Sequence, residues 1–153
     1  MMAAGLSRSL PAAFSLSRYR LFTGKPAGFL HDSDAFDLGG RQLRVIDTPG
    51  HSPGHVCPLD KARGYLFSGD FIYGGAPIDA FYPATDPDQL ARSLKKIARF
   101  APRVNKIYPG YYALGRGTDV LSDAGHWADA LSLQHLDHFG SEIHSIGQLS
   151  VHF

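Results

Sequence analysis

The sequence predicts an α/β fold in which a mixed sheet carries helices on one face, and three observations lead to this expectation. From Phe36 onward, extended and helical patterns alternate in the order strand, strand, strand, helix, strand, helix, strand. Two segments have apolar residues at helical spacing, and turn residues separate the others. The 153 residues are 44% hydrophobic, which is enough for the packed core of one domain.

The first strands of this domain are expected to form a hairpin followed by two short runs. Residues 36–46 place Gly39-Gly40 between two extended arms, which predicts a two-residue turn. Extended runs follow at 56–59 and 65–68, joined by a polar turn. Pro58 lies inside the first run and predicts a sheet edge or a bulge there, because proline cannot donate to a ladder.

Two helices are predicted further along the chain. Asp86 provides an N-cap for the first, Pro87 suits its first turn, and Gln89 occupies the capping-box position. Apolar residues follow at helical spacing until Pro102 ends the pattern. The remaining elements are a strand, a helix and a terminal strand, at residues 104–108, 118–139 and 143–153.

The composition excludes several classes of protein. The formal net charge is +1, whereas a dedicated nucleic-acid binder usually has a basic surface. No apolar run approaches the roughly 20 residues of a membrane span. Cys57 is the single cysteine, so it forms no intrachain disulfide, and we expect it to be a buried small side chain. We therefore expect neither a nucleic-acid partner nor a membrane partner.

Residues 1–31 differ in charge from the rest of the chain. They contain four basic residues and no Asp or Glu, whereas residues 32–153 contain 11 basic and 14 acidic side chains. An acid-free start with Arg and Ser resembles an organelle transit peptide, but we expect a chance or remnant segment, with a transit peptide as the alternative. We therefore divide the chain into a segment of residues 1–31 and a domain of residues 32–153. We place it in the cytoplasm, or in an organelle if the segment is a transit peptide.

Glycine-bearing turns with polar side chains follow three of the predicted strands. Thr48-Pro-Gly-His-Ser-Pro-Gly-His55 follows the hairpin, and its prolines and glycines can hold an imidazole in one orientation, as metal ligation requires. Ser68-Gly-Asp70 and Tyr108-Pro-Gly-Tyr111 follow two later strands. Since active sites of α/β proteins usually lie at strand ends, we expect these turns to meet.

These motifs resemble the C-terminal half of a metallo-β-lactamase-fold hydrolase. The octapeptide from Thr48 to His55, then Leu66-Phe-Ser-Gly-Asp70, a helix and Ile107-Tyr-Pro-Gly110 follow the order of that family, over residues 32–114. The resemblance implies a partial αββα sandwich. It also implies one or two metal ions, usually zinc, holding a hydroxide that attacks an ester, thioester, amide or phosphate. The loop is most similar to the esterase and thioesterase branches, so a small acyl compound is the implied substrate.

The resemblance also implies roles for individual residues. His51 matches the third histidine ligand of the family, and Asp70 matches the carboxylate that bridges two metals and takes part in catalysis. His55 matches a non-ligating position, expected in packing or in support of the ligands. Tyr111 stands where the family has its last histidine, and Tyr73 lies where members contact substrate. Both tyrosines are expected to be substrate-facing or structural.

One part of the family pattern has no counterpart here. The family's His-x-His-x-Asp-His motif is absent, and His31 is the one histidine upstream of His51. Two ligand positions remain, whereas a zinc site needs at least three protein ligands. We therefore expect a truncated hydrolase, or a non-catalytic interaction module whose exposed sheet face binds a second copy or a missing N-terminal half. His144 and His152, in the last strand, carry no ligand pattern.

Overall fold

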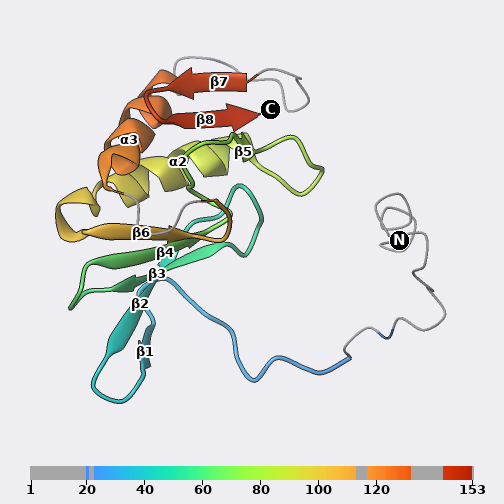
Figure 1. Cartoon of the computed structure of the whole chain (residues 1–153). Coiled ribbons are helices and arrows are strands. Elements are labelled where there is room, and N and C mark those ends of the chain that lie inside the picture. The colour runs from blue at the N-terminus through green and yellow to red at the C-terminus, as the bar shows by residue number, and fades with distance from the viewer. Residues whose placement is uncertain (1–19, 21–22, 113–116, 132–142, 153) are drawn as a thin grey trace.

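The larger sheet of the protein has five strands. The structure is a computed structural model that describes residues 20, 23–112, 117–131 and 143–152 (Figure 1). The strands lie in the order β1-β2-β3-β4-β6. Their bounds are Ala35–Asp37 (β1), Gln42–Asp47 (β2), Val56–Asp60 (β3), Tyr65–Gly69 (β4) and Lys106–Pro109 (β6). β1 to β4 pair antiparallel and β6 pairs parallel with β4, so the sheet is mixed, as predicted.

The hairpin of β1 and β2 confirms the predicted two-residue turn. Gly39 and Gly40 have φ angles of 75° and 82°, and the Leu38 N–H donates to the Arg41 carbonyl oxygen at 2.7 Å. Positive φ at both central positions is the requirement of a type I′ turn, which matches the twist of the flanking strands. The glycine pair therefore sets the register of the hairpin.

β3 is an interior strand, so the edge or bulge predicted from Pro58 is wrong. Pro58 pairs with Val45, whose N–H donates to the Asp34 carbonyl oxygen on the other side of β2. The two residues thus form one of the pairs that exchange no hydrogen bonds in an antiparallel ladder. The ladder between β3 and β4 begins only at Leu59. Proline is tolerated here because no strand needs its missing N–H.

Both predicted helices are present and lie on one face of the larger sheet. α2 spans Pro87–Ala98 and is followed by a 3-10 turn, η2, at Ala101–Arg103. The Asp86 carboxylate accepts a hydrogen bond from the Gln89 N–H at 2.9 Å, which confirms Asp86 as the N-cap. The Gln89 side chain donates to the Asp86 carboxylate and not to its backbone, whose N–H donates to Gly50, so the reciprocal bond of a capping box is not formed. α3 spans Asp119–Leu131, and residues 132–139 of the second predicted helix lie outside the described residues. No described helix is long and apolar enough to cross a membrane.

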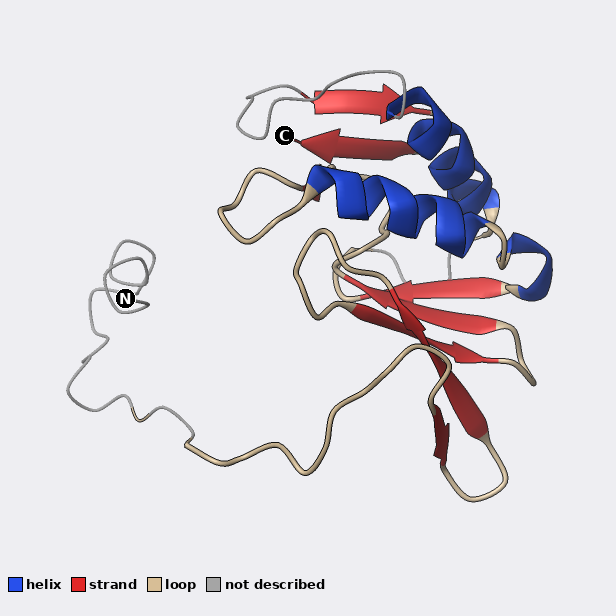
Figure 2. Cartoon of the chain, turned by 180° about the vertical axis from the view of Figure 1, so that it is seen from behind, coloured by secondary structure: helices blue, strands red, loops and turns tan. Residues whose placement is uncertain are grey.

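The predicted terminal strand is a hairpin instead. β7 (Ile143–Ile146) and β8 (Leu149–His152) pair antiparallel around Gly147. β8 also pairs parallel with the short strand β5 (Ile78–Asp79), which gives a three-stranded sheet in the order β5-β8-β7. Both helices lie between this sheet and the larger one (Figures 1 and 2).

One buried cluster joins the two sheets and the two helices. Cys57 belongs to it and is fully buried, as predicted. Burial raises the pKa of its thiol to about 12. The larger side chains of the cluster include Ile46, Leu59, Leu66, Leu90, Leu94, Ile97, Ile107, Leu121, Trp127 and Val151.

The opposite face of the larger sheet is less well covered. Neither α2 nor α3 lies on it (Figure 2). Its aromatic side chains Tyr65, Phe67 and Tyr108 are only half-buried. The Tyr108 ring lies 5.2 Å from the Tyr65 ring and 5.6 Å from the Phe67 ring, measured between centroids. This face therefore presents a continuous aromatic patch, which we call the outer sheet face.

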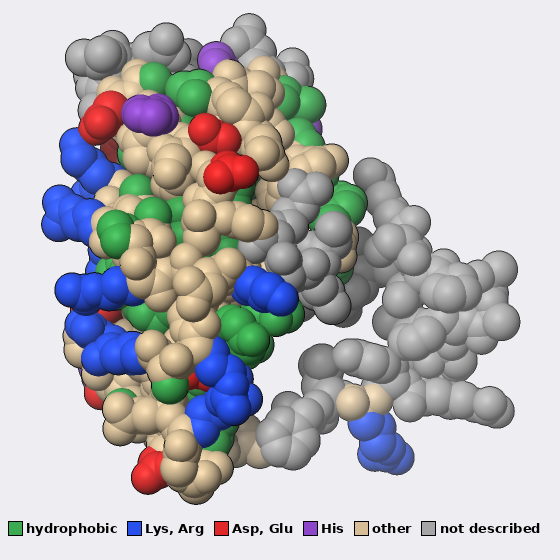
Figure 3. Space-filling model, turned by 60° about the vertical axis from the view of Figure 1, so that its left-hand side comes forward, with side chains coloured by type: hydrophobic (Ala, Val, Ile, Leu, Met, Phe, Trp, Pro, Cys, Tyr) green, Lys and Arg blue, Asp and Glu red, His purple; other side chains and the backbone are tan. Residues whose placement is uncertain are grey.

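Positive charge gathers along α2 and the segment that follows it. Residues 89–118 contain seven basic residues and no acidic one, and Lys and Arg side chains are grouped along one side of the molecule (Figure 3). Lys96 donates to Asp32 at 2.6 Å and to the Asp47 carbonyl oxygen at 2.9 Å. These bonds tie the chain before β1 and the end of β2 to the last turn of α2.

Candidate active site

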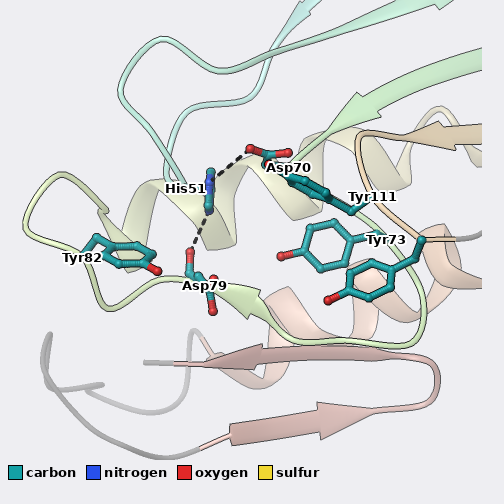
Figure 4. Close-up of a pocket in the computed structure, with 7 residues that line it drawn as sticks. His51, Asp70, Tyr73, Asp79, Tyr82 and Tyr111 are labelled. Carbon is teal, nitrogen blue, oxygen red and sulfur yellow. Dashed lines mark hydrogen bonds and ion pairs between the residues drawn. The ribbon is translucent and has the colours of Figure 1, made fainter. Parts of the chain in front are cut away.

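The turns that follow β2, β4 and β6 converge at one edge of the larger sheet, as expected from the sequence. Together with residues 70–86 between β4 and α2, which we call the strap, they line a cavity of about 350 Å³. The side chains that line it come from all of these segments (Figure 4) and are His51, Asp70, Tyr73, Asp79, Tyr82, Tyr111 and Tyr112.

The loop that carries His51 is fixed against α2. Ser93 donates its hydroxyl hydrogen to the Pro49 carbonyl oxygen at 2.6 Å, and the Asp86 N–H donates to the Gly50 carbonyl oxygen at 2.7 Å. Gly50 has a φ of 135°, and a Cβ at this position would lie 2.3 Å from the backbone nitrogen of Leu90. Only glycine allows the loop to approach the helix this closely.

The backbone partner of His51 fixes the tautomer of its neutral ring. Its Nδ1 lies 2.8 Å from the carbonyl oxygen of Asp79. A carbonyl oxygen can only accept, so Nδ1 carries the proton and the lone pair of the neutral ring is on Nε2. Nε2 lies 3.9 Å from Oδ2 of Asp70 (Figure 4). Metal-binding histidines usually have this arrangement, with one nitrogen bonded to a backbone carbonyl and the other free for the metal.

Asp70 faces His51 from the end of β4. Its side chain is 43% exposed, against 18% for His51, so the carboxylate is open to the cavity and to solvent. The Gly110 N–H donates to the Gly69 carbonyl oxygen at 2.9 Å and thereby joins the turns after β4 and β6. Asp70 and Tyr111 are brought to one cavity by this connection.

His55 is placed behind the cavity and does not line it. Its Nδ1 lies 2.9 Å from Oγ1 of Thr48, and its ring packs on the Phe71 ring at a centroid distance of 5.6 Å. Burial, and then the charge of the nearby His51, lower the pKa of His55. In the folded state His55 is therefore a neutral packing residue that supports the loop.

The other wall of the cavity is aromatic. Tyr73 is almost fully buried and donates its hydroxyl hydrogen to the Pro77 carbonyl oxygen at 2.9 Å. Burial, and then the negative charge of Asp79, raise the pKa of Tyr73 to about 12, so its hydroxyl stays protonated. The Tyr112 ring lies 5.4 Å from it, while Tyr111 and Tyr82 are exposed at the rim.

The described residues do not form a complete metal centre. Nowhere among them do three His, Cys, Asp or Glu side chains come together in a way that could hold a metal ion. His51 and Asp70 offer two ligands, and a catalytic zinc needs three from the protein. Tyr111 does not supply the third, because the protein ligands of zinc are Cys, His, Asp and Glu side chains.

Asp79 is the residue of this site that sequence reasoning missed. Its contribution to His51 is made by the backbone carbonyl oxygen, which any residue type possesses. Its place is set by a two-residue strand that pairs with the end of the chain. Neither property can be recognised from the neighbouring residues, so no sequence pattern could have identified Asp79.

The sequence of the chain matches one known protein family. The profile of the Metallo-beta-lactamase superfamily matches residues 4–111. The chain belongs to this superfamily. The mixed sheet with two helices is the fold that its solved members share with this chain, so the expected fold family is confirmed.

Two curated superfamily relatives have names that refer to acyl compounds. Acyl-coenzyme A thioesterase MBLAC2 of Homo sapiens is 36% identical over 97 residues, covering 62% of this chain and 34% of that protein. Hydroxyacylglutathione hydrolase of Francisella tularensis subsp. novicida is 35% identical over 99 residues, covering 64% of this chain and 39% of that protein. The chain thus spans between a third and two fifths of the length of these relatives.

A solved structure of similar fold covers about two thirds of the chain. TTHA1623, crystallised in a di-iron-bound form, superposes with a TM-score of 0.55 at 29% sequence identity, covering 68% of this chain and 50% of that one. The match supports both the fold and the superfamily's use of metal ions. It concerns iron, so zinc remains an expectation for the present chain.

Proposed function

We propose that this chain carries the His51–Asp70 part of the active site of a metal-dependent hydrolase for esters or thioesters. In this proposal both side chains are metal ligands, and Asp70 also takes part in catalysis. The observation that carries it is the orientation of His51: a backbone carbonyl takes its Nδ1 proton and Nε2 faces Asp70 across the cavity. The superfamily membership supports the same reaction class.

The proposed substrate is a small acyl compound. A cavity of about 350 Å³ lies at the small end of ligand-binding sites. Four tyrosines line it, and flat aromatic surfaces favour an apolar acyl group over a densely charged one. The two curated relatives are named for acyl-coenzyme A and hydroxyacylglutathione, which supports the esterase and thioesterase branches over the nucleases.

The proposed metal is zinc, with one or two ions in a complete site. His51 and Asp70 would hold it, and at least one further ligand has to come from outside the described residues. A bound metal would supply an activated water near neutral pH. The described residues contribute the ligand orientation and the acyl-binding wall.

The test is metal content and thioester hydrolysis measured on the same samples. We expect bound zinc by elemental analysis and zinc-dependent release of thiol from a short-chain acyl-coenzyme A. His51→Ala and Asp70→Asn should lose both, since each removes one of two ligands. His31→Ala is the matched control, because that histidine is exposed and does not line the cavity. Metal content unchanged in His51→Ala would overturn the assignment of His51 as a ligand.

The second candidate is a non-catalytic module that associates through the outer sheet face. The half-buried aromatic rings of Tyr65, Phe67 and Tyr108 support it, because uncovered apolar patches of this kind favour association. This candidate predicts zinc well below one ion per chain and no thioester hydrolysis. The two measurements therefore separate it from the hydrolase.

We further propose a cytoplasmic location, with an organelle as the alternative if residues 1–31 direct transport. Microscopy of a fluorescent fusion with and without residues 1–31 tests the choice. A change of compartment on removal of the segment would favour the organelle.

A further inference from the structure

A single peptide unit links His51 to the end of the chain. In the peptide unit between Asp79 and Ala80, the Asp79 carbonyl oxygen accepts a hydrogen bond from Nδ1 of His51 at 2.8 Å. At its other end, the Ala80 N–H donates to the His152 carbonyl oxygen at 2.7 Å. In a trans peptide the C=O and N–H point in opposite directions. The unit therefore lies between β8 and the histidine, and a rotation about its axis would break both bonds.

β8 is the element that fixes the orientation of this peptide. β5 is two residues long, and β8 is its ladder partner, with Ile78 opposite Val151 and Asp79 opposite His152. A two-residue strand has too few bonds of its own to hold a register. Val151 and Ile78 are both fully buried, which anchors the pair in the core.

The side chain of His152 adds contacts on both sides of the peptide unit. Its Nδ1 lies 3.8 Å from Oδ1 of Asp79, and its ring lies 4.5 Å from the Phe81 ring. Asp79 precedes Ala80 and Phe81 follows it. The His152 imidazole thus lies against Asp79 and Phe81, the residues on either side of Ala80, whose N–H donates to the His152 carbonyl oxygen. These contacts restrain the strap against rotation.

We infer that His152 is a positioning residue for His51: by holding Asp79, it keeps the proton on Nδ1 of His51 and leaves Nε2 available toward Asp70. The inference deepens the proposed function, because an available Nε2 is what a ligand or a base requires. It is nevertheless independent of metal binding, since the tautomer exists in the metal-free protein.

The tautomer of His51 can be determined directly by NMR spectroscopy. Two-bond ¹H–¹⁵N correlation spectra of the histidine rings in the metal-free chain distinguish Nδ1–H from Nε2–H rings, and His51→Ala identifies the peaks of His51. We expect the unsubstituted protein to show only the Nδ1–H form at His51. His152→Ala should add peaks of the Nε2–H form, and His152→Asn, which keeps a polar side chain next to Asp79, should restore the single form.

Two controls make the result of this experiment unambiguous. His31→Ala should leave the His51 peaks unchanged, because His31 is exposed and lies before β1. Protection of the Ala80 amide from hydrogen exchange in His152→Ala would show that β8 is still paired with β5. A change in the His51 tautomer would then result from loss of the His152 imidazole and not from loss of the strand. A pure Nδ1–H form in His152→Ala would overturn the inference, as would mixed tautomers in both the Ala and the Asn variants. Absence of zinc binding or hydrolysis would sink the proposed function and leave these spectra unaffected.

Discussion

At the scale of single residues, the loop that carries His51 depends on the one position where a side chain is excluded. Gly50 combines a φ of 135° with a backbone in contact with Leu90 of α2. Gly54, in the same loop, has an ordinary φ and nothing within 4 Å of a built Cβ. The two glycines therefore form a matched pair for substitution.

Gly50→Ala should lower the free energy of unfolding by about 2–4 kcal/mol, as the sum of backbone strain and overpacking against α2. Gly54→Ala should change it by no more than about 0.5 kcal/mol, as for an unconstrained surface position. Denaturant unfolding of both variants measures the difference. Equal stabilities would show that the loop is not docked on the helix as described.

His55 predicts how stability depends on pH. Burial and the charge of His51 lower its pKa in the folded state, so the unfolded chain takes up the proton more readily. The stabilisation is complete above the unfolded pKa of about 6.5 and is lost as the pH falls through the lower folded value. Unfolding at pH 7.5 and 5.5 should show this loss in the unsubstituted chain. The loss should be smaller in His55→Gln, and an equal loss in both would contradict the assignment.

At the scale of elements, the segments predicted best are those whose signals are local. The N-cap at Asp86 and the Gly39-Gly40 turn each depend on a few adjacent residues, and the structure shows both. The sheet edge or bulge predicted from Pro58 was wrong, because the effect of a proline depends on whether its neighbouring strand needs a backbone N–H at that position. The hairpin of β7 and β8 was missed because each strand has four residues and its partner β5 lies far upstream.

The N-cap of α2 can be tested by two substitutions at one position. Asp86→Ala should lower the free energy of unfolding by about 1 kcal/mol, because it leaves the Gln89 N–H without its acceptor. Asp86→Asn keeps an oxygen acceptor and should lie close to the unsubstituted chain. Thermal or denaturant unfolding gives the comparison, and two equally destabilised variants would argue against a capping role for the side chain.

The site follows the same division between local and distant signals. Motifs at strand ends indicate His51, Asp70 and Tyr111, the family resemblance indicates Tyr73, and all four side chains line one cavity. Asp79 and His152 could not be found in this way. The first acts through its backbone, and the second acts from a strand whose neighbour is set by tertiary pairing.

At the scale of the whole molecule, the two faces of the larger sheet are unequally covered. One face packs on both helices, and the outer sheet face leaves aromatic rings half-exposed. We expect self-association through this face, since burying such rings contributes much of the stability of protein interfaces.

Light scattering after size-exclusion chromatography should therefore give a mass above that of one chain. Phe67→Lys, in the middle of the outer sheet face, should shift the mass to that of a monomer. Ile143→Lys is the control, because Ile143 is also an exposed apolar residue but lies on the smaller sheet. A monomer at high concentration for the unsubstituted chain would count against the interface.

The pairing of β5 with β8 has a kinetic consequence. It joins residues 78–79 to residues 151–152, so it closes one of the longest loops in the chain, and contacts of this kind form late in folding. The cavity wall should then be the last part to become ordered and the first to open. In native-state hydrogen exchange, the Ala80 amide should exchange through opening of the terminal hairpin, at a lower free energy than the amides of β2 and β3. The cavity would in that case open and close while the rest of the core stays folded.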